Sequence, residues 1–219
     1  FELLVTSEEV NVKITNELVL QKVQQNTVLY DKTGEQHYDI ISAFIKSIRG
    51  SDPNAAVYWL ARMIEGGEDV KFIARRLLIL ASEDIGNANP TALVIANNSF
   101  QAVNTIGYPE ARIILSQCVP YLSTSPKSNA AYMAINKAQS LVKKTGDLSV
   151  PLAIRNAPTK LMAEMGHGDE YRYAHNEAHA YAAGENYLPE ELASIRYYEP
   201  TDRGLEKKIN DKLAWLSDL

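Results

Sequence analysis

Cysteine is almost absent from this sequence. Cys118 is the only one among 219 residues, so no disulfide can form within the chain. It lies in the apolar run IILSQCV, which favours a buried structural thiol and fits a reducing cytosol. Long apolar runs are absent too, because no uninterrupted stretch approaches the ~20 residues that a membrane-spanning helix needs. We therefore expect a cytoplasmic protein that does not cross a membrane.

A phosphate-binding loop is also missing. Nucleotide hydrolysis needs a loop such as G-x-x-x-x-G-K-[ST], and no glycine here has that spacing. The segment 77–84, LLILASED, imitates the acidic pair that holds magnesium in such enzymes, but it lies in a helical pattern and lacks the partner loop. A G-x-S-x-G nucleophile motif is absent as well. We predict no catalytic residues and no cofactor site in this chain, which is therefore not an enzyme by itself.

The chain also lacks an overall positive charge. It has 22 lysine and arginine residues against 27 acidic ones, a net charge of −5, which gives no nucleic-acid footprint over the whole surface. Basic residues still cluster locally in the second half of the chain, where they could neutralise phosphates or simply form a solvated helix face. The candidate DNA contacts are Lys127, Lys137, Arg155 and Lys160.

One pair of histidines has a spacing that suits a metal. His175 and His179 are four residues apart, so on a helix they would share one face, as in zinc sites. The H-E-x-x-H pattern needs a glutamate directly after the first histidine, where this chain has Asn176. Only Glu185 or His167 offers a third ligand nearby. We predict no metal site and keep a metal-dependent hydrolase as a minor hypothesis.

Helical periodicity is what the sequence has in abundance. Between residues 37 and 86, apolar side chains recur at helical spacing in three segments, separated by Gly50 and by Gly66–Gly67. Pro53 and Asp69 mark the starts of the second and third helices. The residues predicted to anchor the core are Ile40, Phe44, Trp59 and Met63.

Similar signals predict further helices. One helix begins after Asn89–Pro90 and ends at Gly107. The next begins at Pro109, and Pro120 should kink or end it. Another covers 128–144. With no strand-like alternation between residues 37 and 146, we expect an all-α core.

Near the two ends of the chain the pattern is less regular. Before residue 37, Thr15 could cap a short helix, and 26–36 reads as a polar linker. After Gly146, prolines and tyrosines predict an irregular appendage with helices near 159–165 and 201–216. The last of these would bury Leu205, Ile209, Leu213 and Leu216.

Several blocks carry a family resemblance: HYDIISAFIKSIRGSDPNAAVYWLARMI, FIARRLLILASEDIG, SPKSNAAYMAINKA, VPLAIRNAPTKLM and RYYEPTDRGLEKKI. Together they resemble the C-terminal portion of the replication-associated recombination ATPases, also called MgsA or RarA, a family that includes the Werner-helicase-interacting protein. The resemblance implies that 1–28 is the tail of an AAA+ lid domain. It implies that 29–146 is a helical collar like that of clamp loaders, and that 147–219 is a family-specific extension. ATP and Mg²⁺ would bind an ATPase core that precedes Phe1.

The resemblance also implies a role. It suggests a homotetramer that acts at stalled replication forks, with contacts to DNA and single-strand-binding protein, located at the nucleoid in a bacterium. One departure is HNEAHAYAAGENYLPEEL, where the family leads us to expect a loop with proline and glycine after the histidine. Our first hypothesis is a non-catalytic oligomerisation module of an AAA+ ATPase in replication-fork maintenance and recombination or repair. The alternative is a standalone helical protein-interaction scaffold that does not bind DNA.

Overall fold

The computed structural model describes residues 15–17 and 35–219, and these residues form two compact units. Of the described residues, the first unit contains those up to Ala81 and Thr91–Ser125, and the second contains Ser82–Pro90 and Pro126–Leu219. All regular elements of the described residues are helical, which confirms the all-α prediction. The expected boundaries at residues 28 and 146 come from the resemblance and stay a prediction. The expected lid tail and the 26–36 linker lie almost wholly outside the described residues.

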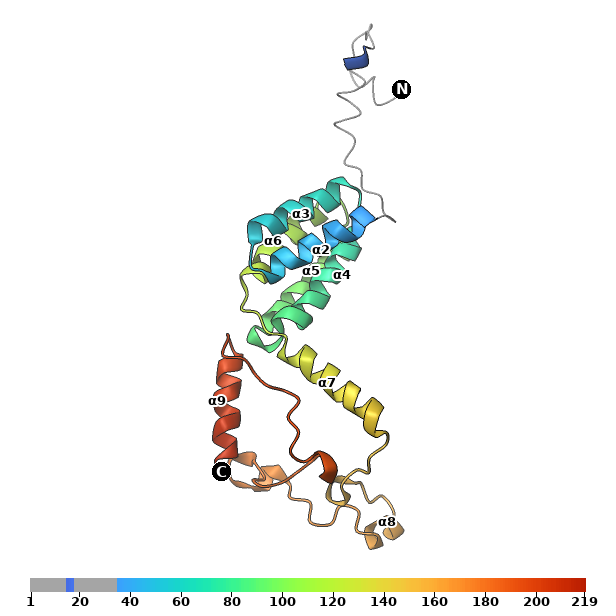
Figure 1. Cartoon of the computed structure of the whole chain (residues 1–219), viewed down its shortest axis with the longest axis vertical. Coiled ribbons are helices and arrows are strands. Elements are labelled where there is room, and N and C mark those ends of the chain that lie inside the picture. Colours follow the sequence, from blue (N-terminus) through green and yellow to red (C-terminus); the bar gives the residue numbers. More distant parts are fainter. Residues whose placement is uncertain (1–14, 18–34) are drawn as a thin grey trace. The chain divides into compact units, whose positions relative to one another are not determined.

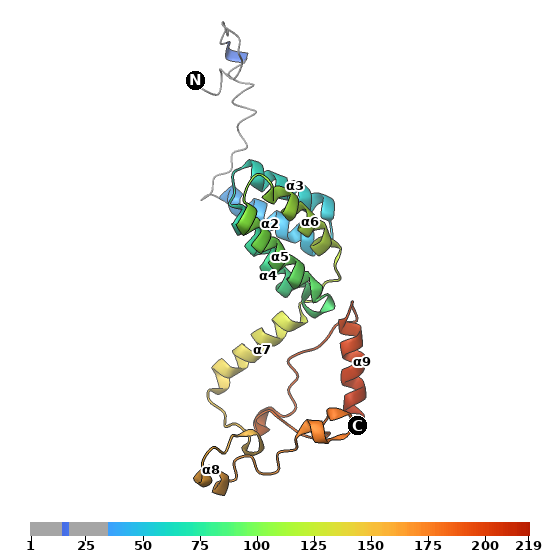
Figure 2. The same cartoon turned by 180° about the vertical axis from the view of Figure 1, so that it is seen from behind.

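The first unit is a bundle of short helices (Figures 1 and 2). Its helices are α2 (Glu35–Arg49), α3 (Pro53–Glu65), α4 (Val70–Leu80), α5 (Thr91–Ile106) and α6 (Ala111–Thr124). Helix α2 packs on α3 and α6, and α5 packs between α4 and α6. Each of the helices predicted between residues 37 and 120 is present.

Local capping explains where these helices begin. The Asp52 side chain accepts a hydrogen bond of 2.9 Å from the Ala55 amide, and Pro53 occupies the first turn of α3. Asp69 caps α4 in the same way, through the Lys71 amide at 2.9 Å. Gly67, at a φ of 78°, supplies the left-handed turn between the two helices.

Three of the four predicted core anchors are buried, namely Ile40, Phe44 and Met63. Trp59 is only partly buried and does not belong to the core. The buried stripe of α3 follows Ala56, Leu60 and Met63, so position 59 falls at its edge. There the indole lies under the Arg62 guanidinium, 5.7 Å from the ring centre.

Pro120 does not end α6, which continues to Thr124. Its neighbours explain why, because Cys118, Val119 and Leu122 are fully buried and hold the helix against the bundle on both sides of the proline. The burial of Cys118 confirms the expected structural thiol, and burial raises the pKa of that thiol.

The second unit is less regular. A π-helical turn, η1 (Ala81–Ile85), leads into it from α4, and η2 (Gly86–Ala88) follows. The unit then contains α7 (Ala130–Thr145), η3 (Leu152–Ile154), α8 (Lys160–Glu164), η4 (Ala174–Asn176), η5 (Ala178–Ala180), η6 (Glu190–Leu192) and α9 (Glu206–Ser217). The prediction of an irregular appendage is confirmed.

The final helix differs from its prediction in two ways. It begins at Glu206 rather than near 201, because residues 201–205 form a turn. Its apolar stripe is not buried, since Leu205 and Leu213 are 42% and 44% exposed. Tyr171, Tyr173 and Tyr187 are also half exposed.

Candidate functional site

The most highly organised polar site of the second unit surrounds Glu206, the first residue of α9. Its side chain is fully buried. Carboxylate oxygen Oε2 accepts hydrogen bonds from the Ser128 hydroxyl at 2.6 Å and from both the amide and the hydroxyl of Thr201 at 2.8 Å. The other oxygen, Oε1, accepts from the Tyr198 hydroxyl at 3.0 Å. One carboxylate therefore joins three segments: the entry to α7, the irregular stretch 198–201 and the start of α9.

The backbone brings these segments together at η2. The Leu205 amide donates to the Ala88 carbonyl at 2.9 Å, and Gly204 lies so close to Ala88 that a Cβ at position 204 would collide with it. The φ of Gly204 is also positive, at 54°. On the other side, the Ser128 amide donates to the Asp84 carbonyl at 2.8 Å, which seats the α7 entry on the π-helical turn.

The hydrogen bonds keep the carboxylate ionised. Burial raises the pKa of Glu206, but the bonds from Ser128, Thr201 and Tyr198 together outweigh it and leave the pKa lowered. Burial also raises the pKa of the Tyr198 phenol, and the adjacent carboxylate adds to that rise. Because Oε2 already has three donors, this group is saturated and suits a structural joint rather than a general base or a metal ligand.

Sequence reasoning missed Glu206. A glutamate at the start of a helix is normally exposed, so its residue type does not suggest burial. The available signal was its position, because Glu206 is three residues before Ile209 and seven before Leu213 and so shares a helix face with them.

The four basic residues predicted to contact DNA have mostly intramolecular partners. Lys137 donates to the Arg196 carbonyl at 2.6 Å and lies 3.3 Å from the Glu199 carboxylate. The Arg155 guanidinium donates to the Val150 carbonyl at 2.6 Å.

The other two candidate DNA contacts, Lys127 and Lys160, differ sharply in exposure. Burial lowers the pKa of Lys127, and the charge of Asp84 opposes that fall. Lys160 is 93% exposed, with Glu164 at 3.9 Å.

The fold does not gather these four residues into one patch. Lys127 precedes α7, whose 16 residues span about 24 Å at 1.5 Å per residue. Lys160 belongs to α8, which lies beyond the C-terminal end of α7 in both views (Figures 1 and 2). Contact of any of them with DNA stays a prediction.

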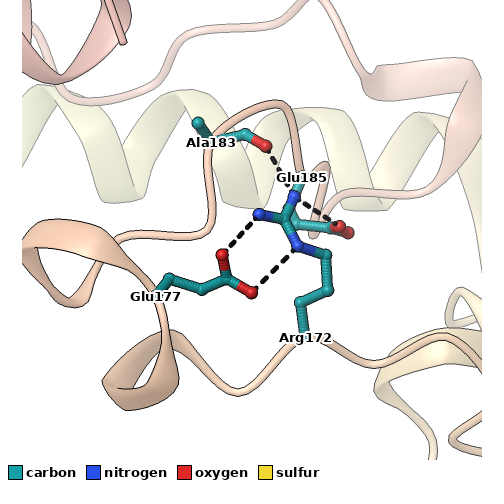
Figure 3. Close-up of polar contacts among 4 residues, drawn as sticks. All are labelled: Arg172, Glu177, Ala183 and Glu185. Atoms are coloured by element: carbon teal, nitrogen blue, oxygen red, sulfur yellow. Dashed lines mark hydrogen bonds and ion pairs between the residues drawn. The ribbon is translucent and has the colours of Figure 1, made fainter.

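A second polar cluster orders the loop that holds the two histidines (Figure 3). The Arg172 guanidinium forms a two-pronged pair with Glu177, at 3.2 and 2.8 Å. Its third nitrogen donates to the Ala183 carbonyl at 2.8 Å and lies 3.4 Å from Glu185. Hydrogen bonding to Arg172 lowers the pKa of Glu177. Glu185, one of the possible third metal ligands, is therefore paired with an arginine.

The histidines do not lie on one helix, so their four-residue spacing does not put them on a common face. His175 lies in η4 and His179 in η5, with a φ of 59° at His179, so two separate turns carry them. The His175 ring lies 5.1 Å from Tyr173, and the His179 ring meets Trp215 edge-on at 5.1 Å. Within residues 15–17 and 35–219, no group of three histidine, cysteine or acidic side chains could hold a metal ion.

Known proteins resemble this chain over nearly its whole length. The model of the MgsA AAA+ ATPase C-terminal family matches residues 50–217, and that of the AAA C-terminal domain matches 1–49. The chain belongs to the MgsA AAA+ ATPase C-terminal family. This confirms the resemblance seen in the sequence blocks.

Three relatives share the name Replication-associated recombination protein A. The protein from Escherichia coli K12 is 50% identical over 202 residues, which cover 92% of this chain and 45% of the relative. The Haemophilus influenzae protein is 48% identical, covering 94% of this chain and 46% of the relative. The Bacillus subtilis protein is 43% identical, covering 94% and 50%. The chain thus spans about half the length of these relatives. Across the described helices, none is long and apolar enough to cross a membrane.

Proposed function

We propose that this chain is the non-catalytic C-terminal oligomerisation module of an AAA+ ATPase that acts in replication-fork maintenance and recombination or repair. The family match over residues 50–217 carries the proposal. ATP and Mg²⁺ bind a nucleotide-binding domain outside this chain, and the module holds four copies together. In the whole protein it works with DNA and single-strand-binding protein, in the cytoplasm and at the nucleoid.

The first unit supports the assembly role because it exposes apolar side chains on its outer surface. The α5–α6 corner exposes Ile106, Tyr108 and Ile113, each more than half accessible. Exposed apolar residues that gather on one region are typical of contact surfaces rather than of monomer surfaces. The saturated Glu206 site supports a structural role for the second unit.

Sedimentation velocity or light scattering at micromolar concentration tests the assembly. We expect a particle of about four times the 24.4 kDa chain mass. A purely monomeric sample over that range would refute the oligomerisation role.

Fluorescence anisotropy with forked and single-stranded DNA tests the second part. Lys160 is the cleanest probe, because it is the most exposed of the four candidates. We expect salt-sensitive binding that weakens on Lys160→Glu and not on Lys71→Glu, a matched charge reversal of an exposed lysine on α4. Absence of binding by the wild-type chain would favour the alternative, a helical scaffold that binds protein and not DNA.

A further inference from the structure

Helix α7 and the stretch 197–201 line a cleft of about 540 Å³ in the second unit. The α7 wall carries Asn129, Met133, Asn136 and Ser140, which follow one another at helical spacing and so form a single stripe. The volume lies within the range of small-molecule sites. The cleft is therefore large enough to hold a ligand.

An ion pair fixes the two walls of the cleft relative to each other. The Lys137 ammonium, on α7, donates to the Arg196 carbonyl at 2.6 Å and lies 3.3 Å from the Glu199 carboxylate. Both Lys137 and Glu199 line the cleft. Because this cation and this anion already neutralise each other, the cleft suits a neutral group better than an isolated phosphate or a cation. A cleft with fixed walls also loses little freedom when a ligand binds.

The polar side chains along the cleft are not used by the fold. Within the part of the chain that the structure describes, four of them make no hydrogen bond with the protein: Asn129, Asn136, Ser140 and Tyr197. Asn129 is the clearest case, because an asparagine at the N-cap usually caps its helix. Here the Ser128 hydroxyl accepts from the Ala130 amide instead, at 3.2 Å, and the Asn129 side chain makes no capping bond.

We infer that this cleft binds a nucleobase. Each asparagine side chain presents a carbonyl acceptor beside an amino donor, which is the pattern that pairs with the edge of a base. Asn129 and Asn136 are seven positions apart, about 10 Å along α7, so they address different edges of one ring system. The Tyr197 ring and the Met133 thioether supply apolar surface against which a flat ring packs.

A nucleobase has two sources, a free nucleoside and an unpaired base of a single strand. The second source rests on the proposed function and deepens it, because it names the form of DNA that this unit contacts. Helix α7 contains no acidic residue, and the exposed Lys144 lies one helical turn after Ser140, so it continues the same stripe. A strand with one base in the cleft would meet this cation with a phosphate.

Two measurements on the 219-residue chain test the inference and separate the two sources. Saturation-transfer NMR with adenosine, guanosine, cytidine and thymidine tests a free nucleoside. Fluorescence anisotropy compares a labelled mixed-sequence single strand with an abasic strand of the same length, which keeps every sugar and phosphate. A nucleoside signal without a difference between the strands identifies a free nucleoside as the ligand. Tighter binding of the strand with bases, by roughly tenfold, identifies single-stranded DNA.

Variants on opposite walls locate the base. Asn136→Leu removes a donor and an acceptor at similar size, and Tyr197→Leu removes the aromatic ring. Each should weaken base binding by roughly tenfold. Asn210→Leu makes the first change at an exposed position of α9 in the same unit and should leave binding unchanged. Circular dichroism checks that each variant folds, and the two variants allow the test to stand if one of them does not.

Two results would overturn this inference while leaving the proposed function intact. One is equal binding of the two strands together with no signal from any nucleoside. The other is base binding that persists unchanged in both Asn136→Leu and Tyr197→Leu, because the base then binds elsewhere. Failure of the proposed function looks different: the chain would be monomeric and would bind neither strand, whereas the nucleoside measurement would still test the cleft.

Discussion

Replacing Glu206 measures what the buried carboxylate contributes to the second unit. Glu206→Ala removes the acceptor for four hydrogen bonds and leaves the Thr201 amide without its partner. Hydroxyls can rotate to other acceptors, but a backbone amide cannot. Glu206→Gln retains an oxygen that can occupy the Oε2 position, while its amino group faces the Tyr198 hydroxyl, which can turn to accept.

The two substitutions therefore differ in expected cost. A buried donor left unpaired costs about 1–3 kcal/mol, and the cavity left by alanine adds to that, so we expect a loss of about 3 kcal/mol. Glutamine loses the charge but keeps one oxygen that can accept three of the four hydrogen bonds, so we expect a loss of about 1–2 kcal/mol. With a urea dependence of about 2 kcal/mol per molar, the alanine variant should unfold about 1.5 M earlier.

Two tryptophans allow each unit to be followed separately. Trp59 lies in the first unit and Trp215 in the second, and the chain has no others. In a Trp59→Phe background, Trp215 fluorescence should report the Glu206 effect. In a Trp215→Phe background, Trp59 should report little change. Glu191→Ala, at an exposed acid of η6, is the control and should leave both midpoints unchanged.

Two results would refute this reasoning. Equal midpoints for the wild type and the alanine variant would show that the network contributes nothing to stability. Equal losses for alanine and glutamine would show that the charge matters and the retained acceptor does not.

Further outcomes follow from the same structure. The pKa of Glu206 is lower in the folded chain than in the unfolded one, so the carboxylate contributes its full stability above the unfolded pKa and loses it as the pH falls through the folded pKa. The urea midpoint reported by Trp215 should therefore drop more steeply below about pH 4 in the wild type than in Glu206→Gln. Gly204→Ala should destabilise the second unit by about 2 kcal/mol, measured by the same urea titration, because a Cβ would collide with Ala88; an unchanged midpoint would contradict that. Arg172→Lys cannot keep the two-pronged pair with Glu177, so limited proteolysis should cut the loop that follows residue 172 faster, while the melting temperature of the whole chain stays the same. Equal cleavage rates in the variant and the wild type would show that this pair does not order the loop.

Local signals in the sequence predict the helices of the first unit well. Capping by Asp52 and Asp69, Pro53 in a first turn and the turn at Gly67 act within a few residues, so their effect is readable without the fold. The same locality explains the failures. The ring of Pro120 satisfies the local rule for ending a helix, but packing of distant helices on its neighbours overrides it.

The sequence by itself determined the helical class, most helix boundaries of the first unit and the family. Only the tertiary structure decided where burial departs from the helical pattern. It left Trp59 and Leu213 partly exposed, buried Glu206, and gave Lys137 an intramolecular partner. Burial depends on contacts such as that between Ser128 and Glu206, which are 78 positions apart. Helical periodicity specifies one face of each helix, and the fold decides whether another segment covers it.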